Sequence, residues 1–133
     1  MKKIVLDTNA YSALIEGDKE VEAVLNQANQ IYLPFIVIGE LYYGFKKGSK
    51  EVRNREILSA FEAMPTVEHL YPNSETLEIY SDIFLELKNN GTPIPTNDVW
   101  IAACTIETGS VLITFDKHFL NVSKIRAWKK LET

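Results

Sequence analysis

Apolar and polar residues along this chain form blocks whose spacing changes repeatedly between a strand-like and a helix-like period. Short apolar runs such as Ile4-Val5-Leu6 stop abruptly at polar residues, which is typical of buried parallel strands. Between these runs, apolar residues recur every three or four positions, as they do on one face of a helix. The pattern predicts strands at Lys3–Leu6, at Ile31–Leu33 ending at Pro34, at Thr66–Leu70 and at Val111–Thr114, with a further short strand near Ile125.

Helical segments are predicted between these strands, and capping residues mark several of their ends. The segments are Ala10–Ile15, Glu20–Asn29, Phe35–Lys47, Val52–Met64, a stretch that Asn73 or Ser74 begins and Asn90-Gly91 closes, and Asp98–Glu107, which stops at Gly109. Their predicted apolar faces include Ile57, Leu58, Phe61 and Met64 in the fourth segment and Leu77, Tyr80, Phe84 and Leu87 in the fifth. Strands that alternate with helices indicate an α/β fold, in which helices cover both faces of a mostly parallel sheet.

The bulk composition narrows the class of protein. A chain of 133 residues, 46% hydrophobic and 24% charged, is expected to form a single globular domain over residues 1–133. Its single cysteine, Cys104, lies in an apolar stretch and excludes an internal disulfide or a cysteine-rich zinc site. No signal-peptide core follows the first lysines and no uncharged run is apolar enough to cross a membrane, so a cytoplasmic location is expected.

The distribution of charge gives two opposing indications. The net charge of −4 argues against a protein that binds nucleic acid through a basic surface. An acidic balance also allows several carboxylates to hold a cation. The basic residues nevertheless gather in two clusters, for which solvated faces are the simplest interpretation: Lys46, Lys47, Lys50, Arg53 and Arg55 in one, and Lys124, Arg126, Lys129 and Lys130 in the other.

Two aspartates follow predicted buried strands. Asp7 comes directly after the first strand, and Asp116 lies two residues after the strand that ends at Thr114. Open α/β sheets bind ligands at the carboxyl ends of their strands, so both positions are candidates for a functional site. Each also has a simpler interpretation, Asp7 as a helix cap and Asp116 as a turn residue.

Two further carboxylates lie on predicted helices. Glu40 is the only charged residue between Leu33 and Phe45, and no cation lies three or four positions away to pair with it. A carboxylate in an apolar helix is costly unless it is exposed, paired or bound to a metal. Asp98 opens a helix that is almost entirely apolar, although an aspartate in a first turn also favours the helix dipole.

Together, Asp7, Glu40, Asp98 and Asp116 are consistent with one acidic site. Clustered carboxylates repel one another unless a cation lies among them, and hard oxygen ligands favour Mg²⁺ or Mn²⁺ over zinc. Such a site suits hydrolysis of a phosphate ester. Neither histidine is assigned to it. His69 falls in a predicted strand, and His118, near Asp116, could contact a phosphate but is more typical of a surface turn that a buried Phe119 closes. The chain has no glycine-rich phosphate loop and no nucleophile elbow.

The segments that carry these acids resemble a known family in order and spacing. "IVLDTNAYSALI", "PFIVIGELYYGF", "PTNDVWIAA" and "VLITFDKHF" are similar to the four acidic motifs of PIN-domain nucleases, and most similar to those of VapC-type toxins of bacterial toxin–antitoxin pairs. The resemblance extends from Ile4 to about Phe119. It implies a PIN-like α/β/α sandwich and an endoribonuclease that depends on Mg²⁺ or Mn²⁺. It further implies an RNA substrate, a homodimer, and a small antitoxin that blocks the site.

The resemblance also assigns residues. It carries the acidic quartet, as catalytic residues and metal ligands, onto Asp7, Glu40, Asp98 and Asp116. Small polar positions of the family fall on Thr8, Asn9, Asn97 and Thr114, which would orient the carboxylates or water.

Two other functions stay open on the sequence. One is a phosphohydrolase that uses Asp7 as a covalent nucleophile, as enzymes of the haloacid dehalogenase type do. Those enzymes carry a second aspartate two residues after the first, where this chain has Asn9. The other is a PIN-like module that binds RNA or protein without cutting, against which the four intact acids argue.

Overall fold

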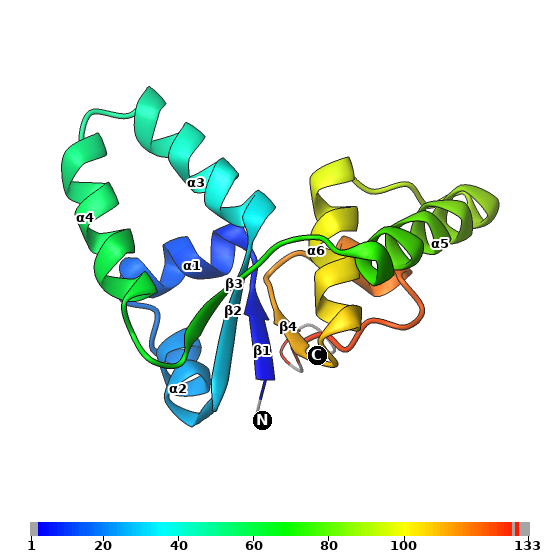
Figure 1. Cartoon of the computed structure of the whole chain (residues 1–133), viewed down its shortest axis with the longest axis horizontal. Helices are drawn as coiled ribbons and strands as arrows, with labels where there is room; N and C mark the ends of the chain where they lie inside the picture. The colour runs from blue at the N-terminus through cyan, green and yellow to red at the C-terminus, as the bar shows by residue number, and fades with distance from the viewer. Residues whose placement is uncertain (1–2, 129, 131–133) are drawn as a thin grey trace.

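The computed structural model describes residues 3–128 and 130, and its centre is a four-stranded parallel sheet. The strands are β1 (Lys3–Leu6), β2 (Gln30–Pro34), β3 (Val67–Leu70) and β4 (Val111–Ile113), in the order β3-β2-β1-β4. Helices cover both faces of the sheet: α1, α2 and α4 lie on one side, and α5 and α6 on the other (Figure 1). The predicted α/β sandwich is therefore confirmed.

The helices match the predicted segments with small changes at their ends. They are α1 (Thr8–Ile15), α2 (Lys19–Gln27), α3 (Phe35–Lys47), α4 (Glu51–Glu62), α5 (Ser74–Asn90) and α6 (Thr96–Glu107), followed by the 3-10 helix η1 (Lys117–Asn121). The bounds of α3 are as predicted. Asn73 caps α5 in a reciprocal capping box, and Gly91 closes it with a positive φ of 69°, a conformation that favours glycine.

The start of α6 differs from the prediction in a way that matters for the site. The helix begins at Thr96 rather than Asp98, because the carbonyl of Pro95 accepts hydrogen bonds from the backbone N–H groups of Asp98 and Val99. Asn97 and Asp98 therefore both lie in the first turn of α6. The rest of the helix is buried from Val99 to Thr105, as its apolar sequence predicts, with Trp100 only half-buried.

The predicted apolar faces of α4 and α5 were partly wrong. Met64 lies beyond the end of α4 and is exposed, and Leu77 and Phe84 of α5 are also exposed. The buried residues of α5 are Thr76, Ile83 and Leu87. A polar contact that apolar spacing does not reveal also joins α5 to α6: Glu107 of α6 accepts hydrogen bonds from Thr76 Oγ1 at 2.5 Å and from Asn73 Nδ2 at 2.6 Å.

The short strand predicted near Ile125 is reduced to an isolated parallel bridge between Leu112 and Ala127. The N–H of Leu112 donates to the carbonyl of Arg126, and the N–H of Trp128 donates to the carbonyl of Leu112. These bonds cover the free edge of β4. Of the second basic cluster, Lys129 lies outside the described residues.

The sheet determines where polar side chains can meet. β1 is an interior strand whose Ile4, Val5 and Leu6 are fully buried. Its end pairs with the end of β4, Leu6 with Ile113, so the residues that follow these two strands leave the sheet side by side. The start of α6 packs near the same edge (Figure 1). None of the described helices is long and apolar enough to cross a membrane.

Candidate active site

Asp7 is the most deeply buried of the four acids, with 5% of its surface exposed. It caps α1, since its Oδ1 accepts a hydrogen bond from the N–H of Ala10 at 2.8 Å. Its other oxygen, Oδ2, accepts a hydrogen bond from the hydroxyl of Thr114, which follows β4. The capping interpretation of Asp7 is therefore correct, and it is compatible with a place in the pocket, because the same carboxylate faces it.

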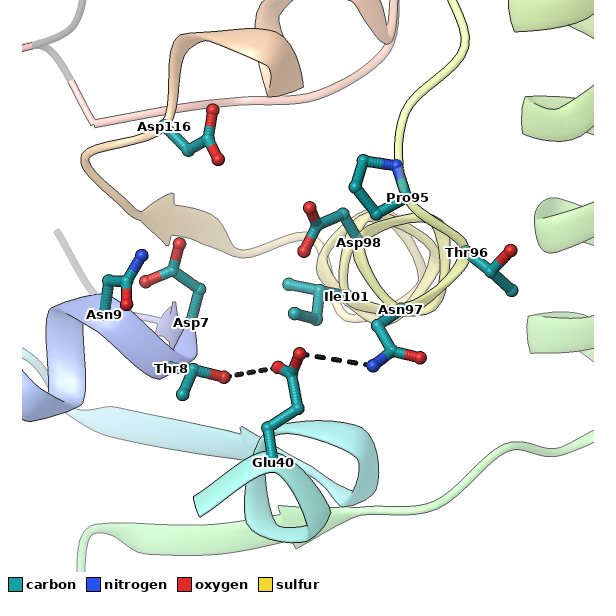
Figure 2. A pocket seen from close by; sticks show the side chains of 10 residues that line it. All are labelled: Asp7, Thr8, Asn9, Glu40, Pro95, Thr96, Asn97, Asp98, Ile101 and Asp116. Atoms are coloured by element: carbon teal, nitrogen blue, oxygen red, sulfur yellow. Dashed lines mark hydrogen bonds between the residues drawn. The ribbon is translucent and has the colours of Figure 1, made fainter. Parts of the chain in front are cut away.

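Glu40 projects from α3 into the same pocket (Figure 2). Its Oε1 accepts a hydrogen bond from Thr8 Oγ1 at 2.5 Å, and its Oε2 accepts one from Asn97 Nδ2 at 3.2 Å. These donors belong to α1 and α6, so Glu40 connects three helices. The half-buried carboxylate is thus paired with neutral donors, which explains how an apolar helix accommodates it without a cation.

Asp98 and Asp116 meet at a side chain to which the sequence analysis assigned no role. His118 Nε2 lies 2.7 Å from Asp98 Oδ2, and His118 Nδ1 lies 2.9 Å from Asp116 Oδ1. Asp116 also caps η1 by accepting a hydrogen bond from the N–H of His118 at 3.2 Å. The surface turn expected for His118 is therefore wrong. The histidine is only 27% exposed and faces the acids.

All four acids line one pocket of about 490 Å³ (Figure 2). Asp7, Glu40, Asp98 and Asp116 come to it from the end of β1, from α3, from the first turn of α6 and from the segment after β4. Thr8, Asn9 and Asn97 line the pocket as well, with Asn9 beside Asp7. Thr114 reaches the pocket only through its bond to Asp7, and its hydroxyl also accepts a hydrogen bond from the N–H of Asp116 at 3.0 Å.

Burial and mutual repulsion raise the pKa of two of the acids. Desolvation raises the pKa of Asp7 to about 6; the bonds from Thr114 and Ala10 oppose this rise, and the charges of Asp98 and Asp116 add to it. Desolvation also raises the pKa of Asp98, although His118 opposes the rise. Like charges held this close favour a cation among them, and the hard oxygen donors suit a divalent ion.

Among the residues that the structure describes, one group offers ligand atoms within 4.8 Å of one another, namely Asp98, Asp116 and His118. An imidazole nitrogen extends the carboxylate donor set, and no spacing signal in the sequence indicated this. "DKHF" places His118 two residues after Asp116, and only the turn into η1 brings its ring back toward Asp98.

An acid-lined pocket at the carboxyl edge of a parallel sheet can hold a divalent cation and suits the hydrolysis of phosphodiesters. The model of the PIN domain family matches residues 4–125, and the chain belongs to this family. Within it, the chain is 30% identical over 116 residues to ribonuclease VapC2 of Haemophilus influenzae strain KW20 Rd, which covers 86% of each chain. It is 28% identical over 130 residues to ribonuclease VapC1 of Haemophilus influenzae strain R2866, which covers 92% of this chain and 93% of the relative.

Solved structures show the same similarity. The DNA-bound VapBC complex of Salmonella typhimurium contains a chain with a TM-score of 0.83 and 26% identity, covering 96% of this chain and 98% of that one. VapBC-1 from nontypeable Haemophilus influenzae gives a TM-score of 0.82 at 26% identity, covering 95% of this chain and 96% of that one. The expected PIN-like fold is thereby confirmed.

Proposed function

We propose that this chain is a divalent-metal-dependent endoribonuclease and the toxin of a toxin–antitoxin pair. The observation that carries the proposal is the single pocket in which Asp7, Glu40, Asp98 and Asp116 converge, within a chain of the PIN domain family. The VapC relatives are named ribonucleases, which supports RNA as the substrate. Function in RNA metabolism supports a cytoplasmic location.

The four acids are proposed as the metal ligands and catalytic residues. Carboxylate oxygens from four separate elements fit Mg²⁺ or Mn²⁺, and His118 adds one nitrogen at the Asp98 side. When bound, such a cation lowers the pKa of water and stabilises negative charge on a phosphate ester.

The chain's own residues orient the acids. Thr8 and Asn97 each donate to one oxygen of Glu40, so the plane of its carboxylate is set before any ligand arrives. Thr114 and the Ala10 N–H do the same for Asp7. Such partners of a metal ligand hold it in the productive orientation. Asn9 is proposed to orient water beside Asp7.

Hydrolysis at such a site adds the oxygen of water to phosphorus and breaks the bond between phosphorus and the 3′ oxygen, which then takes up a proton. The products are a 5′-phosphate and a 3′-hydroxyl. The alternative, attack by the 2′-hydroxyl of RNA, needs a base and an acid on opposite sides of the phosphate. No histidine is among the described residues that line the pocket, and His118 beside it contacts two carboxylates instead.

Incubation of single-stranded RNA with the purified protein tests the reaction. We expect cleavage with Mg²⁺ or Mn²⁺ that stops in EDTA, and sequencing of the fragments should show 5′-phosphate ends. Fragments with 2′,3′-cyclic phosphates, or full activity in EDTA, would falsify the proposal. A protein inert on every RNA under Mn²⁺ would favour the binding module, and an acyl-phosphate trapped on Asp7 would favour the phosphohydrolase.

A cognate antitoxin and a homodimer complete the proposal. The similar solved chains come from VapBC complexes, and the excess of negative charge in the pocket attracts and orients a partner's cationic groups. Expression from the native operon should yield a complex with a small protein whose basic segment docks near Glu40. A chain that always purifies alone would contradict the toxin assignment and leave the nuclease assignment standing.

A further inference from the structure

We propose that the corner between α3 and α4 is a basic arm that binds the single-stranded RNA on one side of the cleaved bond. The arm consists of Tyr42, Tyr43, Lys46, Lys47, Lys50, Arg53 and Arg55. This inference rests on the proposed function, because it assigns the path along which the RNA substrate leaves the pocket. In Figure 1 the corner projects from the periphery of the molecule, away from the sheet.

Helix α3 joins the arm to the pocket without a break. Glu40, Tyr43 and Lys47 are spaced three and four positions apart, so they share one face of α3. At a rise of about 1.5 Å per residue, Lys47 lies about 10 Å along the helix axis from Glu40. A strand whose phosphate is bound beside Glu40 therefore meets Tyr43 and then Lys47 if it continues along this face.

Two cations of the arm lie where the helix dipole opposes them. Lys46 and Lys47 lie in the last turn of α3, where cations favour the helix dipole. Lys50 occupies the N-cap position of α4 without a capping hydrogen bond, and Arg53 lies in the first turn, where the same dipole disfavours a cation. Repulsive placement of this kind in a protein of net charge −4 indicates a ligand with negative charge.

Part of the arm's charge is neutralised and part is available. Glu51 lies 3.0 Å from Arg55 and 3.9 Å from Lys46, so these two cations already have a partner. Within residues 3–128, neither Lys50 nor Arg53 makes an ion pair, and the ammonium of Lys47 lies 5.0 Å from the ring centroid of Tyr43 instead of beside an acid. Three uncompensated cations on one corner match a chain of phosphates.

The aromatic residues distinguish RNA from other polyanions. Tyr43 is 66% exposed on α3. Tyr42 beside it is 37% exposed and has the guanidinium of Arg55 4.1 Å from its ring centroid, so Tyr43 is the more open of the two rings. Exposed aromatic rings between cations are how proteins hold single strands, because bases stack on the rings and phosphates contact the cations. An acidic protein segment would also carry negative charge, but it has no bases that could stack on the rings. In addition, the arm lies on the same face of α3 as Glu40, so it continues directly from the place where the reacting phosphate is bound.

Fluorescence anisotropy with a labelled 12-nucleotide oligouridine in EDTA, where no cleavage occurs, tests the arm across a series of salt concentrations. The variant Lys47→Gln/Lys50→Gln should bind about tenfold more weakly and lower the salt slope by about 1.4, since each single-strand phosphate contact contributes roughly 0.7. The control Lys19→Gln/Lys88→Gln, which removes equal charge from α2 and α5, should bind like wild type.

Replacement of the ring separates stacking from charge. Tyr43→Ala should weaken binding about tenfold with an unchanged salt slope, and Tyr43→Phe should restore it. Three outcomes overturn the proposal. The arm and control variants bind equally weakly, the arm variants bind like wild type, or the wild-type protein does not bind the oligonucleotide. Arm variants that bind RNA normally but no longer purify with an antitoxin also overturn it, in favour of a protein partner.

The cleavage reaction distinguishes failure of the arm from failure of the proposed function. With Mg²⁺, the arm variants should raise the KM for a 16-nucleotide RNA and leave kcat for a trinucleotide within twofold of wild type. If the wild-type protein cuts no RNA, the proposed function is contradicted. If wild type and arm variants have equal KM values, only the proposal of an RNA-binding arm is contradicted.

Discussion

The two halves of the acidic pocket are built differently. Asp7 and Glu40 are held by neutral donors, namely Thr114, the Ala10 N–H, Thr8 and Asn97. Asp98 and Asp116 share one contact, the imidazole of His118, which lies within 2.9 Å of both. The first half is thus fixed by hydrogen bonds from separate elements, and the second half by a single side chain from the turn after β4.

The two halves therefore differ in how the negative charge of their carboxylates is accommodated when no cation is bound. Neutral donors orient a carboxylate but do not cancel its charge, and Asp7 retains a pKa raised to about 6. An imidazole between two carboxylates lowers their repulsion, and His118 opposes the rise in the pKa of Asp98. We therefore expect changes in the first half to act on geometry and stability, and changes at His118 to act mainly on electrostatics.

The largest expected effect is loss of activity on removal of a ligand charge from either half. Asp7→Asn and Asp98→Asn keep the size and shape of the side chain, and each should lower kcat/KM for RNA cleavage by about a hundredfold or more, because the lost ligand is worth several kcal/mol of charge stabilisation. Circular dichroism should show both variants folded. A variant with near-normal turnover would remove that residue from the site, and one that unfolds would make it structural.

The sequence predicted which acids lie at the ends of strands and at the start of a helix, but it could not predict the contacts between their side chains. Strand ends and a helix start can be located from apolar periodicity, which is why Asp7, Asp98 and Asp116 were expected near one edge. The contacts of His118 require the path of the turn into η1, which no period encodes. Likewise, apolar spacing could not indicate the contact between Thr76 and Glu107, a pairing of residues 31 apart in the chain that joins α5 to the end of α6.

The next effect is on the stability of metal-free protein. The pKa of Asp7 is about 6 in the folded state against 3.8 for a solvent-exposed aspartate, so between these values the folded state binds more protons than the unfolded state and loses stability as pH rises. The full shift corresponds to about 3 kcal/mol. Because Asn still caps α1 but loses part of the Thr114 bond, we expect Asp7→Asn to be about 1–2 kcal/mol more stable than wild type at pH 7 in EDTA.

Thermal unfolding of both proteins in EDTA at pH 4 and pH 7 measures this effect. At pH 4 the carboxyl group of Asp7 is protonated in the folded state, so the variant gains little from the lost charge and should be slightly less stable than wild type because of the weakened Thr114 bond. It should become the more stable protein as pH rises from 4 towards 6. Mg²⁺ should reverse the order at pH 7, since a ligand at hundredfold excess over its Kd adds about 2.7 kcal/mol to the folded state that binds it, which exceeds the expected advantage of the variant. A variant that is destabilised equally at both pH values, with and without Mg²⁺, would show Asp7 to be a helix cap alone.

Smaller losses are expected when a donor to the first half is removed and the acids remain. Asn97→Ala takes away the donor to Glu40 Oε2 and Thr8→Val the donor to Oε1, so each should cost about tenfold to a hundredfold in kcat/KM or metal affinity. Isothermal titration with Mn²⁺ separates the two quantities. Thr108→Val, which removes a hydroxyl at the far end of α6, is the matched control, and an equal loss there would mean that any polar deletion disturbs the fold.

The smallest effect belongs to the second half. His118→Gln keeps a donor near the acids but removes the imidazole, so the pKa of Asp98 should rise further above its ordinary value. The sign follows from linkage, because a higher folded-state pKa makes the metal-free protein lose more stability as pH rises. In EDTA the variant should therefore be as stable as wild type at pH 4 and less stable than wild type above the pKa of Asp98. A carbon-detected NMR titration of the Asp98 carboxyl group measures the shift directly, with Asp7 as the internal reference. Equal upward shifts of both residues would mean that His118 acts on the pocket as a whole, and the two halves would then not be independent.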